Sequence, residues 1–440
     1  MRFRFVAISG LLLGAVTAQV PDGHYVVSSF YFAQQGVGGL SIVHPRLPGP
    51  PIAVTGLGAD LTGVVNGSIA GANCVAVLAD GTLLVGEVAG TGATLDVHRV
   101  TLAGVSVATD VPIPVGVVAN NALGSGQISQ IAWIDGTLAA FATGGLVNQA
   151  PLNGNPIGLV DLASGLVQPL VSPTLVGRDL NALAYDRASG ELYVAAQVGS
   201  SASYEIFRVP LAGGAAVLVT NLMSVSGLAV AADGTLLASA NANQVIAIDP
   251  VTGTPTLVAT VGNNVNGLGL ERATGNPVAV LNNITGSGLF WITGGAPSLL
   301  TAAISGVPSG IAVVDSPRGY GSPTSSGIDY EFALEPTPGG LPIAGNSAFA
   351  IQDQASSAAG QPGLLVANFA PASTPLFGVQ VLIDPVAPIV IGLFPAGIAV
   401  PFPIPAGFAP LRIYLQSFHL GTASAPGLAA TAGMLLGTIR

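Results

Sequence analysis

The amino-acid sequence predicts an all-β protein, a six-bladed β-propeller followed by a C-terminal β-sandwich. Three observations predict it. Helical periodicity is almost missing, whereas short runs of Val, Ile, Leu and Ala, bounded by Gly, Asn, Asp and Pro, recur over residues 20–315. Pairs of these runs are joined by glycine turns at a regular spacing. After Asp315 the spacing stops and another strand pattern begins.

The N-terminal residues predict export. Residues 1–18 carry Arg2 and Arg4, then an apolar stretch, then small residues up to Ala18, which is the pattern of a cleaved signal peptide. We therefore expect Gln19 to begin the mature chain and the protein to be secreted, periplasmic or displayed at the cell surface. About 420 remaining residues are more than one core usually serves, so we expect two folding units.

Composition excludes some partners. Only 7% of residues are charged, the basic residues are all arginine, and the net charge is −10, so no cationic surface is expected for nucleic acid or anionic lipid. The most apolar later stretch, residues 386–411, contains several prolines, which break helices, so we expect no transmembrane segment after signal cleavage. The lone Cys74 has no partner for an internal disulfide and is expected to be a buried thiol.

The repeat consists of a short apolar strand, a turn that usually ends in glycine, and a second apolar strand. It occurs at 73–85, 129–140, 181–195, 226–238 and 266–280, and its first strand alone at 309–314. The turn glycines Gly81, Gly136, Gly190, Gly234 and Gly275 are 55, 54, 44 and 41 residues apart, the length of one four-stranded propeller blade. Glycine suits these turns because it adopts positive φ without steric cost.

Both ends of the repeat region are incomplete. The last repeat has only its inner strand, and the N-terminal strands at 24–33, 39–44 and 52–55 have no inner strand of their own. Joining them in one blade would close a ring of six blades over residues 19–316 and remove two unpaired edges.

The repeats resemble the NHL-type and gluconolactonase-like propeller superfamily. The closest matches are Ser226-Gly227-Leu228-Ala229-Val230 with Asp233-Gly234, and Gly190-Glu191-Leu192-Tyr193-Val194-Ala195. The resemblance implies the propeller fold over residues 20–315. It implies little about activity, because propellers carry many unrelated functions.

The segment 317–327 is rich in Pro, Gly and Ser and is expected to be a linker, followed by a β-sandwich at 328–440. This region resembles a C-terminal domain of many secreted proteins of environmental bacteria. The matching residues are Gly319 to Ser322, Leu341 to Asn346, Pro401 to Pro405, Leu411 to Gln416 and Leu435 to Arg440.

The most informative polar pattern lies at the first position of each inner strand. Asn and Ser alternate there, at Asn73, Ser129, Asn181, Ser226, Asn266 and Ser309. Inner strands line the axial channel of a propeller, so these side chains are predicted to form a polar ring that could hold water, a cation or a ligand hydroxyl. The alternative is that they only satisfy backbone groups at the strand entries.

Other candidates are weaker. Gluconolactonase-like enzymes hold a divalent metal with carboxylates and asparagines, but no Asp or Glu occupies the ring, and Glu87 is expected at a surface or in a loop. The histidines are dispersed and are expected to be half exposed in strands. Trp133 and Trp291 are expected to pack between blades, with sugar stacking as the alternative.

We therefore predict a non-enzymatic propeller that binds an unknown protein, glycan or small ligand, with no cofactor. One alternative is a metal-dependent lactonase or hydrolase that uses the channel, in which case a calcium ion is the expected cofactor. The other is a structural component of the cell envelope.

Overall fold

The structure is a computed structural model of the chain. It describes residues 24–30, 38–43, 51–54, 57, 59–62, 71–78, 82–90, 95–100, 107–111, 125–134, 138–144, 154–187, 189–231, 233–271, 275–282, 288–301, 304–314, 318–320, 334–336, 347, 349–353, 362–376, 379–386, 388–404, 412–420, 428–431 and 433–437. The expected signal peptide, residues 1–18, lies outside the described residues.

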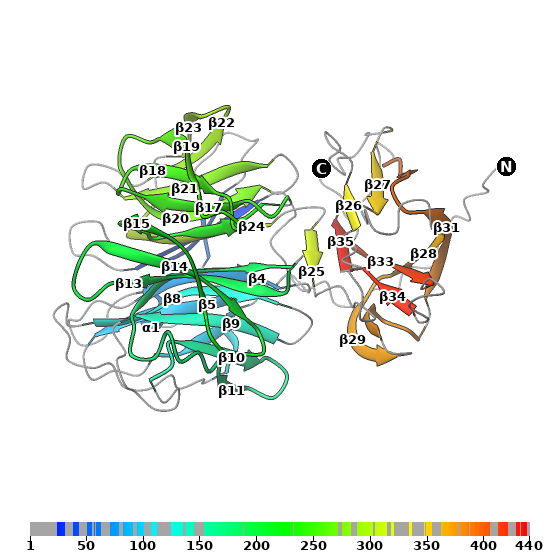
Figure 1. Cartoon of the computed structure of the whole chain (residues 1–440), viewed down its shortest axis with the longest axis horizontal. Helices are drawn as coiled ribbons and strands as arrows, with labels where there is room; N and C mark the ends of the chain where they lie inside the picture. The colour runs from blue at the N-terminus through cyan, green and yellow to red at the C-terminus, as the bar shows by residue number, and fades with distance from the viewer. Residues whose placement is uncertain are drawn as a thin grey trace.

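The protein is all-β, and antiparallel four-strand units follow one another along the first part of the chain (Figure 1). The units are β4 (Gly71–Val77), β5 (Leu83–Gly90), β6 (Val97–Val100) and β7 (Val107–Val111); β8 (Ser125–Trp133), β9 (Leu138–Gly144), β10 (Ile157–Asp161) and β11 (Leu166–Pro169); β12 (Leu180–Asp186), β13 (Glu191–Gln197), β14 (Ser203–Pro210) and β15 (Val217–Met223); β16 (Leu228–Val230), β17 (Leu236–Ala240), β18 (Gln244–Ile248) and β19 (Pro255–Thr260); and β20 (Asn264–Glu271), β21 (Asn276–Asn282), β22 (Gly288–Thr293) and β23 (Ala296–Thr301). The turn glycines Gly190, Gly234 and Gly275 have φ of 70°, 83° and 70°, as the sequence predicts.

The two ends of this region form a further unit. The strand β1 (Tyr25–Phe30) pairs with β2 (Gly39–Val43), which pairs with β3 (Ile52–Ala53). On its other side β1 pairs with β24 (Val307–Val313), with Tyr25 opposite Val313 and Val27 opposite Ile311. The expected pairing of 309–314 with the N-terminal strands is therefore present, and β1 has partners on both edges. A short helix, α1 (Ala59–Thr62), contacts β4.

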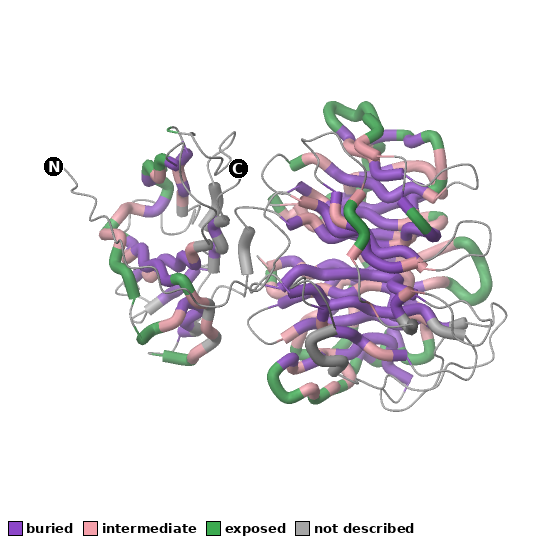
Figure 2. The backbone as a smooth tube through the Cα atoms, turned by 180° about the vertical axis from the view of Figure 1, so that it is seen from behind, coloured by how far each residue is buried: buried purple, intermediate pink, exposed green. Residues whose placement is uncertain are grey.

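The first strands of the units contact one another in a closed circle. Contacts join β4 to β8, β8 to β12, β12 to β16, β16 to β20, β20 to β24 and β24 back to β4. The units are therefore arranged like propeller blades around these inner strands. Between them lie apolar cores; Phe207 of one unit, for example, packs in the same cluster as Ile134 and Leu175 of the preceding unit. Figure 2 shows buried residues along the inner strands and exposed residues toward the periphery.

The rest of the chain forms smaller sheets. Its strands are β25 (Arg318–Tyr320), β26 (Leu334–Pro336), β27 (Ala350–Asp353), β28 (Pro362–Asn368), β29 (Pro371–Leu376), β30 (Val379–Ile383), β31 (Ile389–Pro395), β32 (Ala399–Pro401), β33 (Arg412–Leu420), β34 (Leu428–Ala430) and β35 (Gly433–Gly437). A six-stranded sheet has the order β25-β35-β33-β28-β31, with β34 paired to β33. Its Leu365 and Leu415 share a core with Ile351 of the three-stranded sheet β26-β27-β32, so these two sheets pack together.

The start of the C-terminal region differs from expectation. Residues 318–320 fall inside the expected linker 317–327, yet they form β25, which pairs with β35 from Gly433 to Leu435. The backbone hydrogen bonds with β35 make these residues part of the C-terminal sheet. One apolar cluster also includes residues of β8 and β9 together with residues of β28, β30 and β33, so the two regions share buried packing.

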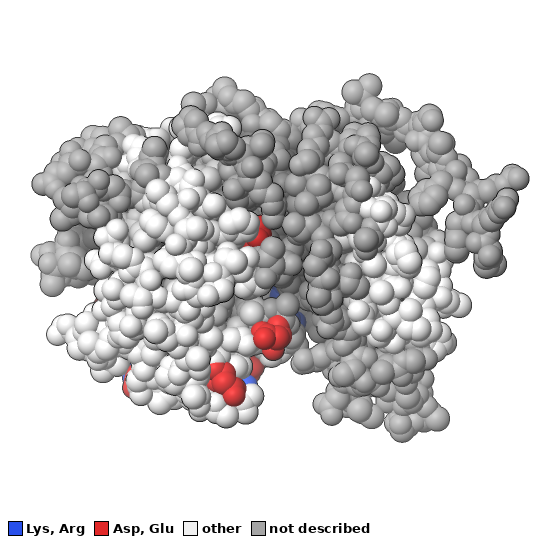
Figure 3. Space-filling model, turned by 90° about the horizontal axis from the view of Figure 1, so that it is seen from above, with Lys and Arg blue, Asp and Glu red and all other residues white. Residues whose placement is uncertain are grey.

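Charge is sparse on the surface. On the face in Figure 3 the described residues are almost all uncharged, with a few scattered acidic and basic groups. Within the described part of the chain, no helix has the length and apolar character needed to cross a membrane.

Candidate functional site

The predicted polar ring lies where the inner strands begin. Asn73, Ser129, Asn181 and Asn266 each sit at a register shift between the first and second strands of their unit. Ser309 occupies the equivalent shift between β24 and β1. A bulge leaves one residue out of the ladder and turns its side chain, which frees these groups to bond outside their own unit.

Every ring residue except Ser129 hydrogen-bonds to the next unit in the circle, and always to the backbone carbonyl that precedes the next ring residue. Asn73 Nδ2 donates to Ile128 O at 2.9 Å, Asn181 Nδ2 to Val225 O at 2.6 Å, Ser226 Oγ to Val265 O, Asn266 Nδ2 to Pro308 O at 3.1 Å and Ser309 Oγ to Ala72 O at 3.4 Å. The ring is therefore a circle of bonds between neighbouring inner strands.

The junction between the β8 and β12 units is the exception. Ser129 is buried, and among the described residues its Oγ has no hydrogen-bond partner. Gln127 bridges this junction instead. Its Nε2 donates to Asn181 Oδ1 at 3.3 Å, and its Oε1 accepts from Asn73 Nδ2 at 3.3 Å. Gln127 was not predicted, because it lies two residues before the aligned position.

Glycine follows the ring residue in the units where the inner strands come closest. A Cβ at Gly227 would lie 2.6 Å from Leu268 N, one at Gly267 would lie 2.7 Å from Ser309 O, and one at Gly310 would lie 2.8 Å from Asn73 O. Only a residue without a side chain fits there. At the same position the β4 and β12 units carry Cys74 and Ala182, and the β8 unit carries Gln130.

These contacts favour the structural interpretation of the ring. The amide and hydroxyl donors already hold adjacent strands together, so the expected binding of an ion or ligand by the ring stays a prediction. Among the described residues no group of three or more His, Cys, Asp or Glu side chains is arranged as metal ligands.

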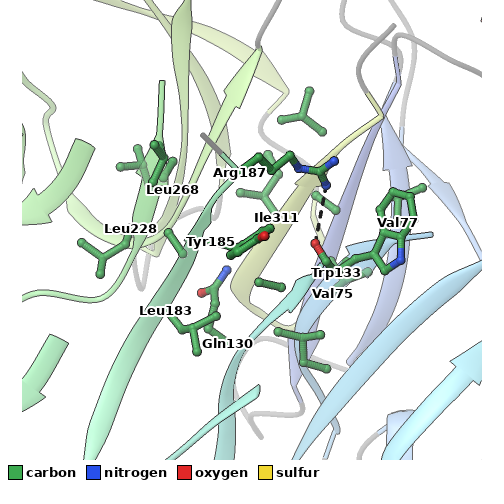
Figure 4. Close-up of a pocket in the computed structure, with 18 residues that line it drawn as sticks. Val75, Val77, Gln130, Trp133, Leu183, Tyr185, Arg187, Leu228, Leu268 and Ile311 are labelled. Atoms are coloured by element: carbon green, nitrogen blue, oxygen red, sulfur yellow. Dashed lines mark hydrogen bonds between the residues drawn. The ribbon is translucent and has the colours of Figure 1, made fainter. Parts of the chain in front are cut away.

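A pocket lies farther along the inner strands (Figure 4). Its volume is about 250 Å³, and it is lined by residues of the inner strands, such as Val75, Leu183 and Ile311. These three side chains are themselves buried in the cores between units, so polar atoms contribute at least as much of the exposed lining as apolar atoms do. The polar side chains among the described lining residues are Gln130, Tyr185 and Arg187. None of these was singled out from sequence.

The position of Arg187 is set by Trp133, which also lines the pocket. The guanidinium carbon lies 5.3 Å from the centroid of the Trp133 ring, and Nη2 donates to Trp133 O at 3.5 Å. Trp133 is the last residue of β8, and Arg187 directly follows β12. The contact therefore joins the β8 and β12 units, the pair between which Ser129 makes no hydrogen bond. Trp133 is buried, in agreement with the expectation that it packs between blades. Its ring also supports the Arg187 guanidinium through the cation–π contact.

A buried acid–base pair lies away from this pocket. Glu87 in β5 is 3% exposed, and its Oε2 lies 3.2 Å from Nε2 of the buried His98 in β6. Burial raises the pKa of Glu87, while the hydrogen bond and charge of His98 and the Asp96 N–H lower it in part. The predicted surface placement of Glu87 is wrong, because β5 is covered on both faces. The prediction of half-exposed histidines is likewise wrong for His98 and for His419, which is buried 3.1 Å from Ser417 Oγ.

Comparison with known proteins finds distant structural similarity. No family model and no curated protein matches it. Among solved structures, TolB from Acinetobacter baumannii matches with a TM-score of 0.46 and 18% identity over 66% of each chain. PorZ of Porphyromonas gingivalis, a bacterial surface component of the type-IX secretion system, matches with a TM-score of 0.42 and 12% identity over 97% of this chain and 59% of PorZ.

The class defined by the fold is an all-β protein with propeller-like blades. The chain is distantly similar in structure to these two proteins. It spans slightly under two thirds of the length of TolB and 59% of PorZ.

Proposed function

We propose that the chain is a six-bladed β-propeller with a C-terminal β-sandwich, and that it acts outside the cytoplasm as a non-enzymatic module that binds a small organic ligand in its central pocket. The closed circle of inner strands supports the blade number. The pattern of residues 1–18 supports the location.

The pocket is the observation that carries the function. Small-molecule sites are typically concave and apolar, with a few placed polar groups. The central pocket is concave, and it has placed polar side chains, Gln130, Tyr185 and Arg187 among the described residues. Its walls come from every unit of the circle, so its shape depends on the closed ring.

The lactonase alternative has less support. A hard divalent cation needs oxygen ligands with negative charge for tight binding, and the ring offers amides and hydroxyls whose donors join the strands. A calcium titration by calorimetry tests it. Micromolar binding lost in Asn181→Ala and Asn266→Ala would favour the metal site over the proposed module.

The proposed binding is tested with probes that share one apolar body. Cyclohexanol, cyclohexanecarboxamide, cyclohexanecarboxylate and cyclohexylamine are titrated into the full chain by calorimetry, up to about 10 mM because fragments of this size bind in the millimolar range. We expect heat from at least one of them. The Ala229→Met variant narrows the pocket and should abolish that heat, with circular dichroism used to check that the variant is folded, because Ala229 also packs against the apolar core of the next unit. Absence of heat with all probes would refute the function.

The domain boundaries are part of the proposal. Residues 19–316 expressed alone should melt cooperatively and keep the probe binding of the full chain, whereas 318–440 should fold without binding the probes. The opposite outcome, an insoluble fragment 19–316, would also be informative, because the N-terminal and C-terminal regions share one apolar cluster. It would mean that the C-terminal sheets belong to the propeller core and are not a separate domain.

A further inference from the structure

We infer that the central pocket selects uncharged amides, that is, compact ligands whose N–H and C=O groups pair with backbone groups of the inner strands. This inference rests on the proposed function and names the ligand class of the same pocket.

Along the pocket, the inner strands are paired on one edge. The strand β4 pairs with β5, β8 with β9, β16 with β17 and β24 with β1. Among the described strands, none pairs with the opposite edge of these four over the residues that line the pocket. Because the inner strands contact one another in a circle, this open edge of each strand faces the centre of the circle.

The ladder hydrogen bonds identify the residues of the open edge. At one end of the four strands the ladder bonds run from Leu78 N to Thr82 O, Ile134 N to Leu138 O, Ala231 N to Thr235 O and Val314 N to His24 O. Hydrogen-bonded and non-hydrogen-bonded pairs alternate along an antiparallel ladder, so residues one and three positions before each of these donors point their N–H and C=O groups away from it. These open-edge residues all line the pocket, and they are Val75, Val77, Ile131, Trp133, Leu228, Val230, Ile311 and Val313.

The pocket meets these residues at their backbone. The side chains of Val75, Leu228 and Ile311 are buried in three different cores between units. Side chains stand roughly perpendicular to a sheet, whereas the N–H and C=O groups lie along its plane and reach the open edge. An inner strand therefore offers the pocket mainly backbone donors and acceptors.

Arg187 shows that a donor in the pocket can reach the open edge. Trp133 O belongs to the open edge of β8, and it accepts a hydrogen bond of 3.5 Å from Arg187 Nη2 (Figure 4). The other terminal nitrogen, Nη1, is buried. A ligand is therefore recognised by the remaining backbone groups, and these two nitrogens of the guanidinium do not face it.

Backbone edges favour a ligand that both donates and accepts. An amide carries an N–H and a C=O in one plane, so it can satisfy one acceptor and one donor of the edge together. A carboxylate only accepts and an ammonium only donates, and each also loses the hydration of its charge in the pocket. The volume of about 250 Å³ lies near the lower limit of small-molecule sites, so it suits a compact amide.

Ligands of nearly equal shape separate the amide from its competitors. Cyclohexanecarboxamide, cyclohexanecarboxylate and cyclohexyl methyl ketone differ in the group beside the carbonyl, which is an amino group, a charged oxygen or a methyl group. In calorimetric titrations of the full chain, the amide should bind about tenfold more tightly than the ketone, because one neutral hydrogen bond is worth about that factor. The carboxylate and cyclohexylamine should bind more weakly than the amide by about the same factor or more.

Hydrogen exchange followed by NMR on the isotope-labelled full chain locates the contact. In the free chain the N–H groups of Val230 and Val313 should exchange faster than those of their ladder-bonded neighbours Ala229 and Ala312. Saturating cyclohexanecarboxamide should slow the exchange of at least one open-edge N–H group several-fold. The ladder N–H groups of the same strands are the internal control and should keep their rates.

Each result decides between the two levels of the proposal. Binding of the ketone, the carboxylate or the amine as tight as that of the amide would overturn the amide inference while leaving the proposed binding function intact. Bound amide that slows no open-edge N–H group would also overturn it, as would open-edge groups that are as protected as the ladder in the free chain. Silence of every probe would instead remove the proposed function itself.

Discussion

The circle of bonds between inner strands predicts opposite effects for two substitutions at equivalent positions. Asn73→Ala removes a buried side chain that donates to Ile128 O at 2.9 Å and to Gln127 Oε1 at 3.3 Å. Ser129→Ala removes a buried hydroxyl that has no partner among the described residues. Both changes shorten a polar side chain to the same methyl group at a bulge in an inner strand.

The magnitudes follow from the contacts. Leaving a buried carbonyl without its donor costs about 1–3 kcal/mol, so Asn73→Ala should lower the free energy of unfolding by that amount. The thiol of Cys74 still contacts Ile128 O at 3.3 Å, which favours the lower half of the range. Burying an unbonded hydroxyl costs about 1–3 kcal/mol in mutational data, so Ser129→Ala should be neutral or stabilising by up to that amount.

The assay is urea denaturation of the full chain followed by circular dichroism, with the transition midpoints compared at a common slope. Asn73→Ala should lower the midpoint and Ser129→Ala should keep or raise it. Equal losses in both variants would refute the reasoning, because they would show that Ser129 makes a stabilising contact and that the circle has no weak junction.

Three further predictions concern single residues. Gly310→Ala places a Cβ 2.8 Å from backbone atoms of the neighbouring inner strand, so it should lower the free energy of unfolding, measured by urea denaturation, by about 1–3 kcal/mol or more. Gly262→Ala is the control, because its Cβ would have no atom within 4 Å and the substitution should be tolerated. Burial raises the pKa of the Cys74 thiol, so iodoacetamide at mildly alkaline pH should label it only as fast as the propeller unfolds, and rapid labelling of the folded chain would contradict its burial. Burial also raises the pKa of Glu87 above its ordinary value of 4.5. The stability contributed by the protonated Glu87 is therefore complete below pH 4.5 and is lost as the pH rises through the higher pKa of the folded chain. Glu87→Gln should reduce the loss of stability between acid and neutral pH, and an unchanged dependence of stability on pH would contradict this.

Much of the fold was predictable because its signals are local. The turns at Gly190, Gly234 and Gly275 combine positive φ with flanking apolar runs, and both features are visible in a short window of sequence. The pairing of β1 with β24 was predictable for a different reason: each end of the repeat lacked the strand that the other supplied. The position of β25 was not, since a short strand among Pro and Gly residues is defined only by its partner β35.

The site was predictable only in part. Sequence alignment located the ring residues, but not their acceptors, which are backbone atoms 39 or more residues away in another unit. Arg187 meets Trp133 across 54 residues because the circle brings β8 and β12 together. The scarcity of basic residues, 11 in the chain, is the signal that could have drawn attention to Arg187 directly after an inner strand. Glu87 was misplaced because strands covered on both faces lose the alternation that identifies a surface position.

Because β1 pairs with β24, the N-terminal sheet can be completed only late in the synthesis of the chain. The strand β1 emerges early, yet its neighbour β24, which begins at Val307, is made only after all the other units of the circle. Until then β1 has one open edge, and the pocket, whose wall includes Ile311, is incomplete. Contacts between residues so far apart in the sequence form slowly, because closing the long loop between them lowers the conformational entropy before the contacts can stabilise the fold. The nascent chain therefore has no complete central pocket until about 310 of its 440 residues, roughly 70%, have been made.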